Sequence, residues 1–347
     1  MQAKMTPRRS FPRRLTPSGS MPAMLKQHFG EARAEPPRQC ESIPYNKGRF
    51  AIIGDVQPTS RVEFWRKSNA RERVQLIQQI TMEVPDFLAI VGDLVFCGSS
   101  AANWTAFDIL ATPLYDARVP VFPLLGNHDY GIVRHAALRH FFTRFPHLER
   151  CHWFSRTYGP LGLIFLDSNA RRLPMTQWRR QVRWYNQELQ HFEQRSDIRG
   201  VLVLLHHPPY TNSTLVSDDL AVQRAFVPPF MQARKTLAMI SGHVHSYERF
   251  TRAEKTFLVT GGGGARSKVY TDWRRRHLDD CFDGPPLRGF HFLVLTPLST
   301  RLEIEMRGLQ QHHGGFETLD SLALPWAQAL AGGDDDLPGV CPTRSLT

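Results

Sequence analysis

The stretch Leu237-Ala238-Met239-Ile240-Ser241-Gly242-His243-Val244-His245 organises the rest of this chain. Its first four residues form a short apolar run, which predicts a buried strand. One residue separates the two histidines that follow the glycine. Because alternate residues of an extended chain point the same way, both imidazoles are expected to face one site just past the strand's end. Neutral imidazole is a common ligand of transition metals, although two polar loop histidines would show the same spacing.

Four segments upstream repeat this arrangement, in which an apolar run ends at residues that bind metals. The predicted strands span residues 50–53, 88–91, 119–125 and 201–205, and they end at Gly54-Asp55-Val56-Gln57, Gly92-Asp93, Gly126-Asn127-His128-Asp129 and His206-His207. Apolar residues at helical spacing separate the strands, most clearly over residues 178–192. Strands that alternate with helices predict an α/β fold. Since the site of such a sheet lies at the carboxyl ends of its strands, the clusters are expected to converge.

The composition is that of an ordinary globular protein. Of the 347 residues, 41% are hydrophobic and 22% are charged. No apolar run approaches the roughly 18 residues that span a bilayer. The five cysteines are odd in number and widely spaced, which is neither a disulfide framework nor a zinc-ribbon pattern. We therefore expect reduced thiols and a cytoplasmic location.

The net charge of +11 is unevenly placed along the chain. Residues 1–47 contain nine Lys or Arg and three Asp or Glu and are rich in proline, so they are expected to form a disordered basic arm. Its Arg8-Arg9-Ser10-Phe11 resembles an export signal, but prolines interrupt the apolar region that should follow. Residues 48–310 are expected to form the folded domain and residues 311–347 a C-terminal tail. The arm allows a nucleic-acid partner, but a solvated arm is favoured, because the folded part is only mildly basic and lacks basic-aromatic interleaving.

The residue types at the strand ends indicate a site for two metal ions. Carboxylate, amide oxygen and imidazole together suit borderline-hard ions such as Mn, Fe or Zn. One carboxylate can bridge two ions about 3.5–4 Å apart, and such a pair clamps the attacking and leaving oxygens of a phosphoryl group. Each residue alone has a simpler explanation, since Asp or Asn after Gly is often a turn residue. The complete ordered set favours metal binding.

This ordered set resembles the calcineurin-like metallophosphoesterase superfamily, most closely its purple-acid-phosphatase-type branch, over roughly residues 49–307. The segments Gly242-His243-Val244-His245-Ser246-Tyr247-Glu248-Arg249 and Gly261–Gly264 add to the similarity. The resemblance implies an α/β (α+β) four-layer sandwich, in which two mixed β-sheets pack face to face and are flanked by helices. It also implies a metallophosphoesterase whose dinuclear centre activates water to attack the phosphate monoester of a small substrate.

By position, the resemblance implies ligands for two divalent metal ions and three residues around the substrate. The implied metal ligands are Asp55 and His245 for the first ion, Asp93 for both ions, and Asn127, His206 and His243 for the second. His128 would be catalytic, because it would face the phosphate and protonate the leaving oxygen without binding metal. His207 and Tyr210 would border the substrate.

Two positions depart from the pattern of the family. Many members carry His where this chain has Gln57, and the purple branch carries a metal-binding Tyr where this chain has Phe96. Phe cannot bind a metal, and the Gln amide oxygen is a weaker and harder donor than imidazole. We therefore expect Gln57 to be at most a weak ligand of the first ion. That ion is then expected to be Mn, Fe(II) or Mg, without the colour of a phenolate–iron pair.

Two alternatives stay open. A phosphodiesterase or nuclease on the same fold would use the basic arm to neutralise phosphates. A catalytically weak metal-binding scaffold protein would account for Gln57 and Phe96. The polar segment 208–229, which contains Asp218 and Asp219, is expected to border the pocket, and its acidic residues argue mildly against a highly anionic substrate.

Overall fold

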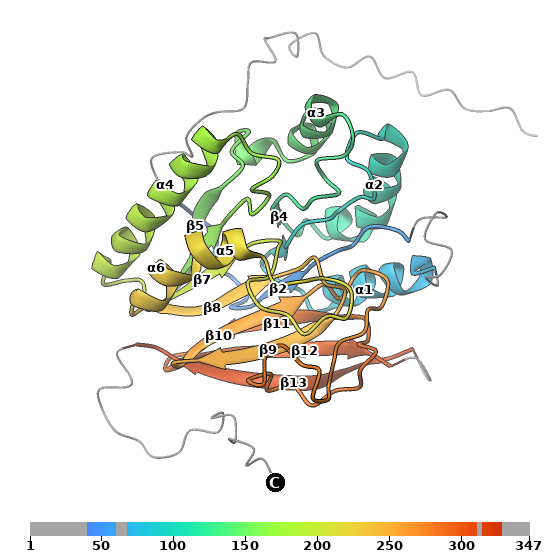
Figure 1. Ribbon diagram of the computed structural model, residues 1–347. Helices are drawn as coiled ribbons and strands as arrows, with labels where there is room; N and C mark the ends of the chain where they lie inside the picture. Colours follow the sequence, from blue (N-terminus) through green and yellow to red (C-terminus); the bar gives the residue numbers. More distant parts are fainter. Residues whose placement is uncertain (1–39, 60–67, 311–313, 328–347) are drawn as a thin grey trace, which may run out of the picture. The chain divides into compact units, whose positions relative to one another are not determined.

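The structure, a computed structural model, describes residues 40–59, 68–310 and 314–327. Most of the predicted arm and the end of the predicted tail lie outside these residues. The described chain forms two mixed β-sheets of seven and six strands, which we call sheet A and sheet B. They pack face to face with helices on their outer faces (Figure 1), so the predicted fold class is confirmed.

The order of strands in sheet A is β1-β5-β6-β7-β8-β10-β9. Their bounds are β1 (Glu41–Ser42), β5 (Phe154–Tyr158), β6 (Leu161–Phe165), β7 (Gly200–Leu204), β8 (Thr236–Ser241), β9 (Tyr247–Arg252) and β10 (Lys255–Thr260). The order in sheet B is β13-β12-β11-β2-β3-β4. Their bounds are β2 (Phe50–Ile53), β3 (Leu88–Ile90), β4 (Val121–Pro123), β11 (His291–Pro297), β12 (Arg301–Leu309) and β13 (Phe316–Pro325). The runs β6-β7-β8-β10 and β2-β3-β4 are parallel, so each run presents its carboxyl ends together.

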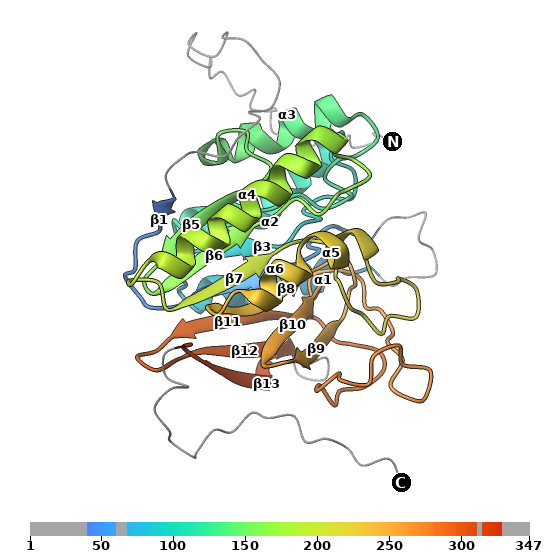
Figure 2. The same cartoon turned by 60° about the vertical axis from the view of Figure 1, so that its left-hand side comes forward.

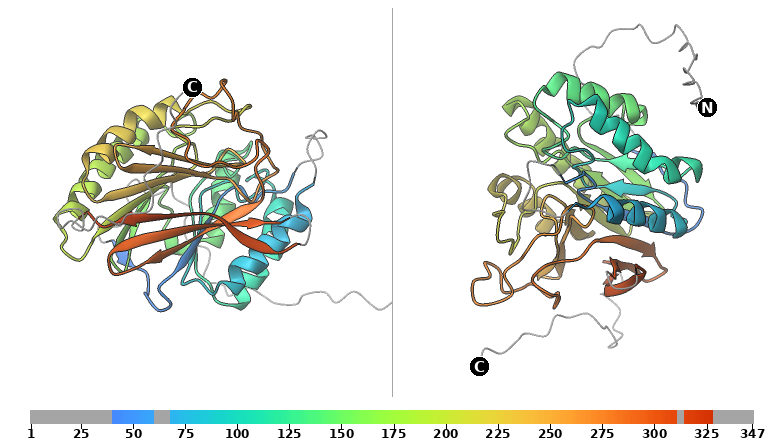
Figure 3. Two further views of the ribbon diagram at one scale, coloured as in Figure 1. Left: turned by 90° about the horizontal axis from the view of Figure 1, so that it is seen from below. Right: turned by 90° about the vertical axis from the view of Figure 1, so that its right-hand side faces the viewer.

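Helices cover the outer face of each sheet. Those on sheet B are α1 (Ala70–Met82) and α2 (Ala101–Asp116), which stand in front of the strands in the right-hand view of Figure 3. Those on sheet A are α4 (Met175–Gln194), α5 (Leu220–Ala225) and α6 (Val227–Gln232), which come forward in Figure 2. After β4 come α3 (Arg134–Arg144) and the 3-10 helix η2 (Pro146–Leu148). Among the described residues, no helix combines the length and the apolar character needed to cross a bilayer.

Strand β7 shows why the central strands are apolar throughout. Val201 and Val203 pack into the cluster that α4, α5 and α6 cover, whereas Leu202 and Leu204 pack into the cluster between the sheets. Successive side chains of a strand point to opposite faces, and here both faces are buried. A continuous apolar run is therefore the sequence signature of a strand inside this sandwich.

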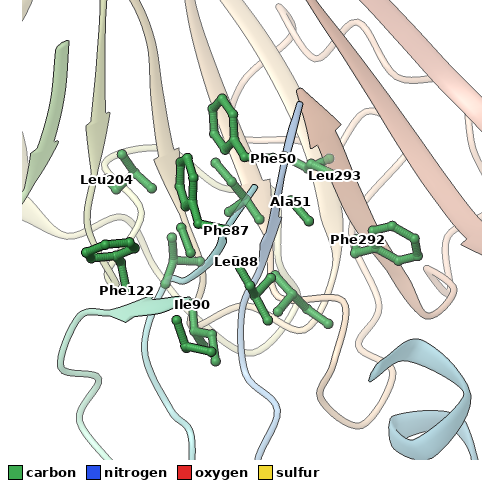
Figure 4. Packing of buried hydrophobic residues seen from close by; sticks show 14 of the residues in the cluster. Phe50, Ala51, Phe87, Leu88, Ile90, Phe122, Leu204, Phe292 and Leu293 are labelled. Atoms are coloured by element: carbon green, nitrogen blue, oxygen red, sulfur yellow. The ribbon is translucent and has the colours of Figure 1, made fainter. Parts of the chain in front are cut away.

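The core between the sheets fixes how the strand ends meet (Figure 4). Phe50 and Phe87 stack with their ring centroids 4.6 Å apart, and Phe122 meets Phe87 edge-on at 5.7 Å. Leu204 of sheet A and Phe292 of β11 belong to the same cluster. Because interiors of this kind are close-packed, the strands cannot slide relative to one another without opening voids.

The folded domain extends past both predicted boundaries. Within the predicted arm, β1 pairs with β5, and the following Ile43 is buried. At the other end, β13 pairs with β12 from Phe316 to Pro325, so the prediction of a tail from residue 311 is wrong for this segment. The strand lies at the edge of sheet B, and most of its side chains are exposed or half-buried. It therefore gives no apolar signal in the sequence.

Segment 208–229 contains helix α5 and the start of α6, where a polar loop was predicted. The carboxylate of Asp219 accepts the N–H of Val222 at 2.9 Å and so caps α5. Asp218 accepts a hydrogen bond from His277 Nε2 at 2.8 Å. Both acidic side chains are therefore used within the fold.

Candidate metal centre

The loops after β2 and β3 hold two carboxylates close together. Asp55 and Asp93 are 0% and 1% exposed, and donor oxygens of the two lie within 4.8 Å of each other. Their backbones have φ of 61° and 56°, a left-handed conformation that concentrates at functional sites. Asp55 accepts the N–H of His243 at 2.9 Å, and Asp93 accepts the N–H of His128 at 2.8 Å. Two buried carboxylates at this spacing require positive charge beside them.

The loops after β7 and β8 bring imidazoles to the same place from the other sheet. His206 Nε2 lies 3.3 Å from Asp93 Oδ2, and His245 Nε2 lies 3.5 Å from Asp55 Oδ1. His243, with φ of 66°, places its ring centroid 5.0 Å from that of His206. Sheet B therefore supplies oxygen donors to the site, and sheet A supplies nitrogen donors.

These side chains form two overlapping groups with the spacing of metal ligands. One donor atom from each of Asp55, Asp93 and His206 lies within 4.8 Å of the others. The same holds for His206, His207 and His243. The fold thus gathers residues that the sequence predicted as ligands, and it adds His207 to their immediate neighbourhood.

Gln57 points its amide oxygen at the first group. The amide is oriented with its nitrogen donating to the backbone carbonyl oxygens of Asp55 and Asp93, at 3.0 and 2.9 Å. The side-chain oxygen then lies 3.2 Å from His245 Nε2. Both amide hydrogens have acceptors in this arrangement, which holds the oxygen at the site as a hard, neutral donor.

The partners of the Nδ1 atoms show which imidazoles present a lone pair to the site. His206 Nδ1 lies 2.9 Å from the carbonyl oxygen of Val91, and His245 Nδ1 lies 2.8 Å from that of Ala265. Since a carbonyl oxygen only accepts, each Nδ1 carries the proton. Nε2 of each neutral ring is therefore free to bind a metal, and the carbonyl group fixes the orientation of the ring.

His207 has the opposite tautomer. Ser168 Oγ accepts the N–H groups of His206 and His207, at 3.1 and 2.9 Å, and lies 2.9 Å from His207 Nδ1. Because these two N–H groups occupy its lone pairs, the hydroxyl must donate its own hydrogen to His207 Nδ1. The neutral His207 ring thus carries its proton on Nε2, and it presents an N–H donor to the site instead of a metal ligand.

Asn127 and His128 follow β4 and take different positions. Asn127 Oδ1 lies 3.0 Å from His206 Nε2, as two ligands of one ion would. His128 Nδ1 donates to the carbonyl oxygen of Phe96 at 2.7 Å, which leaves Nε2 for another partner. The Phe96 ring packs beside His128, with centroids 5.1 Å apart, where the sequence had suggested only a lost ligand.

Asp129 joins two of these loops, a role that the sequence did not reveal. Its carboxylate accepts the N–H groups of Asp93 at 2.8 Å, Leu94 at 2.9 Å and Gly126 at 2.9 Å. The backbone of Gly126 lies so close to Asp93 that a Cβ on Gly126 would be 2.2 Å from Asp93 Oδ1. In the sequence, an acidic residue after Asn-His looks the same as a solvated turn residue, so only the three contacts reveal its function.

The donors open onto a cavity of about 150 Å³. Its lining residues are Gln57, Pro58, Thr59, Asp93, Phe96, His128, Val216, His243, His245 and Ala265. The run Gly261–Gly264 packs behind the site, since a Cβ on Gly264 would lie 2.5 Å from His245 Cγ. The cavity therefore combines polar groups at its base with apolar groups on its walls.

Tyr210, which was predicted to border the substrate, is not among the residues that line this cavity. Its ring packs against Phe257 at 5.0 Å and His277 at 5.3 Å between centroids. The guanidinium of Arg252 lies 3.5 Å over the ring centre. Tyr210 was predicted at the site because it is close to His206 in the sequence. The chain between these two residues turns away from the cavity.

Buried Glu248 determines this turn. Its carboxylate accepts the O–H of Thr211 and the N–H of Asn212, both at 2.6 Å. It also accepts the O–H of Ser246 at 3.0 Å. The segment after β7 is thus tied to the segment after β8, so Glu248 supports the site without facing it.

The sequence of this chain is similar to those of known proteins. The sequence profile of the calcineurin-like phosphoesterase family matches residues 48–247. The chain belongs to that family. Purple acid phosphatase 22 of Arabidopsis thaliana is 24% identical over 296 residues, which cover 80% of this chain and 59% of the relative. The chain therefore spans less than two thirds of the length of that curated relative.

Solved structures with the same fold include a purple acid phosphatase. PPD1 from yellow lupin, Lupinus luteus, superposes with a TM-score of 0.60 at 18% identity, over 88% of this chain and 58% of that chain. GAP50, described as the anchor in the inner membrane complex of Plasmodium, gives 0.64 at 14% identity, over 86% of this chain and 99% of that chain. At these identities the likeness concerns the fold alone.

The electrostatics of this calcineurin-like phosphoesterase favour a cation at the site. Burial raises the pKa of Asp93, but the charge and hydrogen bond of His206 outweigh it, so the pKa is held well below its usual range. Burial also lowers the pKa of His206, but Asp93 and then Asp55 raise it to about 9. The two carboxylates therefore stabilise positive charge between the sheets.

The other two imidazoles of the cluster are held neutral. Burial, followed by the charge of His206, lowers the pKa of His207 to about 3. The same two causes bring the pKa of His243 well below its ordinary value. Metals bind neutral imidazole and ionised carboxylate, so His243 is already in its metal-binding form, and a bound cation would replace the proton that the carboxylates stabilise on His206. This set of residues fits divalent metal ions.

Proposed function

We propose that this protein hydrolyses phosphoesters with the help of two divalent metal ions. The observation that carries the proposal is the meeting of Asp55, Asp93 and His206, from both sheets, with donor atoms within 4.8 Å of one another. Buried carboxylates that share a site need a compensating cation. Membership of the calcineurin-like phosphoesterase family supports the same activity.

The pairings within the site support a division of ligands between two ions. The first ion would be held by Asp55, Gln57 and His245, the second by Asn127, His206 and His243, and Asp93 would serve both. Bound divalent cations supply Lewis acidity, because they lower the pKa of water toward about 7 and offset the charge of a phosphoryl group. Gln57 in place of an imidazole favours Mn, Fe(II) or Mg for the first ion, and the imidazole-rich second set favours Mn, Fe or Zn.

Two histidines would act on the substrate. His128 lines the cavity with Nε2 free of the Phe96 carbonyl group, and it would donate a proton to the leaving oxygen. His207 would donate its Nε2–H to a phosphate oxygen, because Ser168 fixes that tautomer. A neutral donor binds phosphate without a competing affinity for the metal.

A small phosphate monoester is the substrate that we favour. The cavity of about 150 Å³ has room for one compact phosphorylated group. A diester with two large substituents, or a nucleic-acid strand, would leave most of its atoms outside. We also keep a cytoplasmic location as a prediction, which is supported by the absence of a disulfide at Cys40, Cys97, Cys151 and Cys281 among the described residues.

The experiment is metal add-back to the full chain. The protein is stripped of metal, and Mn, Fe(II), Zn or Mg is restored singly before assay with p-nitrophenyl phosphate and bis(p-nitrophenyl) phosphate. We expect turnover to depend on metal and to be faster with the monoester. Faster cleavage of the diester would select the phosphodiesterase alternative. Two bound ions without hydrolysis of either compound would select the scaffold, and a purple protein would contradict the absence of a tyrosine ligand.

A further inference from the structure

The basic charge of the folded domain is concentrated in one stretch of chain. Residues 134–183 contain ten arginines and two acidic residues, a formal charge of +8 against +11 for the whole protein. The stretch covers α3, the strands β5 and β6, the loop after β6 and the first half of α4. The folded part is mildly basic in total, but its positive charge is concentrated on a few elements.

The loop after β6 brings part of this charge to the metal centre. Ser168 bonds to His206 and His207, as described above, and Asn169 Nδ2 donates to the carbonyl oxygen of Leu125 at 2.9 Å. The loop then turns tightly, because the N–H of Arg172 donates to the carbonyl oxygen of Asn169 at 2.8 Å. The exposed side chains of Arg171 and Arg172 thus lie within a few residues of the contacts to the site.

Helix α3 brings a third arginine to the same loop. The hydroxyl of Tyr130, just before α3, donates to the carboxylate of Asp167 at the end of β6. The guanidinium of Arg134 lies 5.7 Å from the centre of the Tyr130 ring. Within the part of the chain that the structure describes, Arg134, Arg171 and Arg172 form no ion pair.

Two of these arginines lie near the tyrosine that holds the loop. Burial is the main cause of the raised pKa of Tyr130, and the positive charges of Arg134 and Arg172 oppose it. Tyr130 donates to Asp167, the chain neighbour of Ser168. Both guanidinium groups are therefore near the loop that contacts His206 and His207.

The segment after β7 adds little free negative charge near the cavity. Its Val216 lines the cavity, as does Ala265. Asp218, close to Val216 in the chain, accepts His277 Nε2 at 2.8 Å and lies 3.9 Å from Arg276. The expectation that acidic residues of this segment disfavour an anionic substrate does not hold, because their charge is already paired or used as a cap.

Building on the proposed phosphoesterase function, we infer that Arg171 and Arg172, with Arg134 beside them, bind a second anionic group of the substrate. The substrate class is a phosphomonoester that carries a further phosphate or carboxylate a short distance from the phosphate that is hydrolysed. A guanidinium suits this role, since its planar fork binds both groups with two parallel hydrogen bonds. His207, which contacts the loop and neighbours the metal-binding histidines, links the two anion-binding positions.

The test measures binding without turnover. Phenylphosphonate and benzene-1,4-diphosphonate differ only in a second anionic group, and their C–P bonds resist hydrolysis. Each is titrated calorimetrically into the full-length, Mn-loaded protein, into an Arg171→Ala/Arg172→Ala variant and into an Arg139→Ala/Arg183→Ala control. The control removes two exposed arginines of the same basic stretch, one on α3 and one on α4. Thermal unfolding checks that both variants fold.

We expect the wild type and the control to bind the diphosphonate about 10- to 100-fold more tightly than phenylphosphonate, the range of one or two charge-assisted hydrogen bonds. The Arg171→Ala/Arg172→Ala variant should lose this preference and keep its affinity for phenylphosphonate. Equal binding of both phosphonates by the wild type would overturn the inference, as would equal losses in the two variants. A protein that shows the preference but hydrolyses no phosphoester retains the binding site and rejects the proposed function; the reverse result rejects the inference alone.

Discussion

Two aspartates flank strand β3, and they have different roles. Asp86 precedes the strand and accepts the N–H groups of Asn46, Lys47 and Gly48 at 3.0, 2.8 and 3.1 Å. It also accepts the hydroxyl of Tyr158 in sheet A at 2.7 Å. Asp93 follows the strand, with one backbone N–H on Oδ1, and turns Oδ2 towards the imidazole of His206 in sheet A. Each carboxylate thus joins the two sheets.

The difference lies in what satisfies the negative charge. Neutral donors surround Asp86 and bond mainly to its Oδ2, so this residue has a structural role. Asp93 is more deeply buried and has few neutral donors, so its charge calls for a cation. The residue before this three-residue strand thus supports the fold, and the residue after it serves the metal site. Substitution of Asp86 should therefore lower stability, and substitution of Asp93 should lower activity.

The largest effect is expected for Asp93→Asn. The amide keeps the shape of the side chain but removes the charge shared by the two ions, so phosphomonoester hydrolysis should fall by about 10³-fold. Metal content per chain, measured by mass spectrometry, should fall as well. Asp86→Asn is the matched control, and it should keep its metal and its activity per folded molecule. Equal loss of activity in both variants would contradict the different roles that we assign to Asp86 and Asp93.

His128→Ala is expected to have the next largest effect. The variant should lose about 10²-fold in kcat, the low end for general acid catalysis, because the proton donor is gone. Its metal content should stay that of the wild type, since His128 makes no metal bond in the proposal. His191→Ala, an exposed histidine of α4, serves as the control. Unchanged turnover of an aryl phosphate, or loss of metal, would contradict this role of His128.

Asp86→Asn tests the contribution of Asp86 to the stability of the fold. The amide oxygen can take the place of Oδ2, which accepts these bonds, so the variant loses mainly the negative charge that strengthens them, which should cost about 1–3 kcal/mol in the free energy of unfolding at pH 7. Burial raises the pKa of Asp86. The hydrogen bonds from Tyr158 and the backbone lower it by more than burial raises it, so the pKa in the folded state lies below the usual value. The stabilisation is thus present above the unfolded pKa of about 3.9 and lost as the pH falls through the folded pKa.

Urea unfolding at pH 7 and near pH 3.5 measures this contribution. The gap in stability between wild type and Asp86→Asn should narrow at the lower pH. A gap that stays constant would show that the charge of Asp86 is not what holds residues 46–48.

The smallest effect is expected at Gln57. Gln57→Ala should weaken binding of the first ion about tenfold, the lower end for groups that support a metal site, because a neutral oxygen donor is lost. Gln57→His should instead tighten binding, since it restores an imidazole. Calorimetric titration of metal-stripped protein measures both, with Gln78→Ala on the exposed face of α1 as control. If neither variant changes the affinity, Gln57 has no part in binding metal.

The sequence alone determined the order of strands and helices around the site and the types of donor at the strand tips. Apolar runs such as Val201–Leu205 and the residues after them, His206 among them, are local features, because backbone geometry and side-chain alternation act over a few residues. Parallel strands then guarantee that Asp55, Asp93 and Asn127 emerge at one edge. The α/β class and the grouping of these three donors could be predicted for this reason, whereas the sandwich of two sheets was implied by the resemblance to the family.

The tertiary structure decided everything that depends on contacts between distant parts of the chain. Gln57 meets His245 across 188 residues and His206 meets Val91 across 115, so the orientation of the amide and the tautomer of the ring follow from packing. Tyr210 packs against Phe257 and His277 and does not line the cavity, for reasons that no local pattern contains. A short motif specifies which donors a loop carries; the close-packed interface between two sheets specifies which of them can reach the same ion.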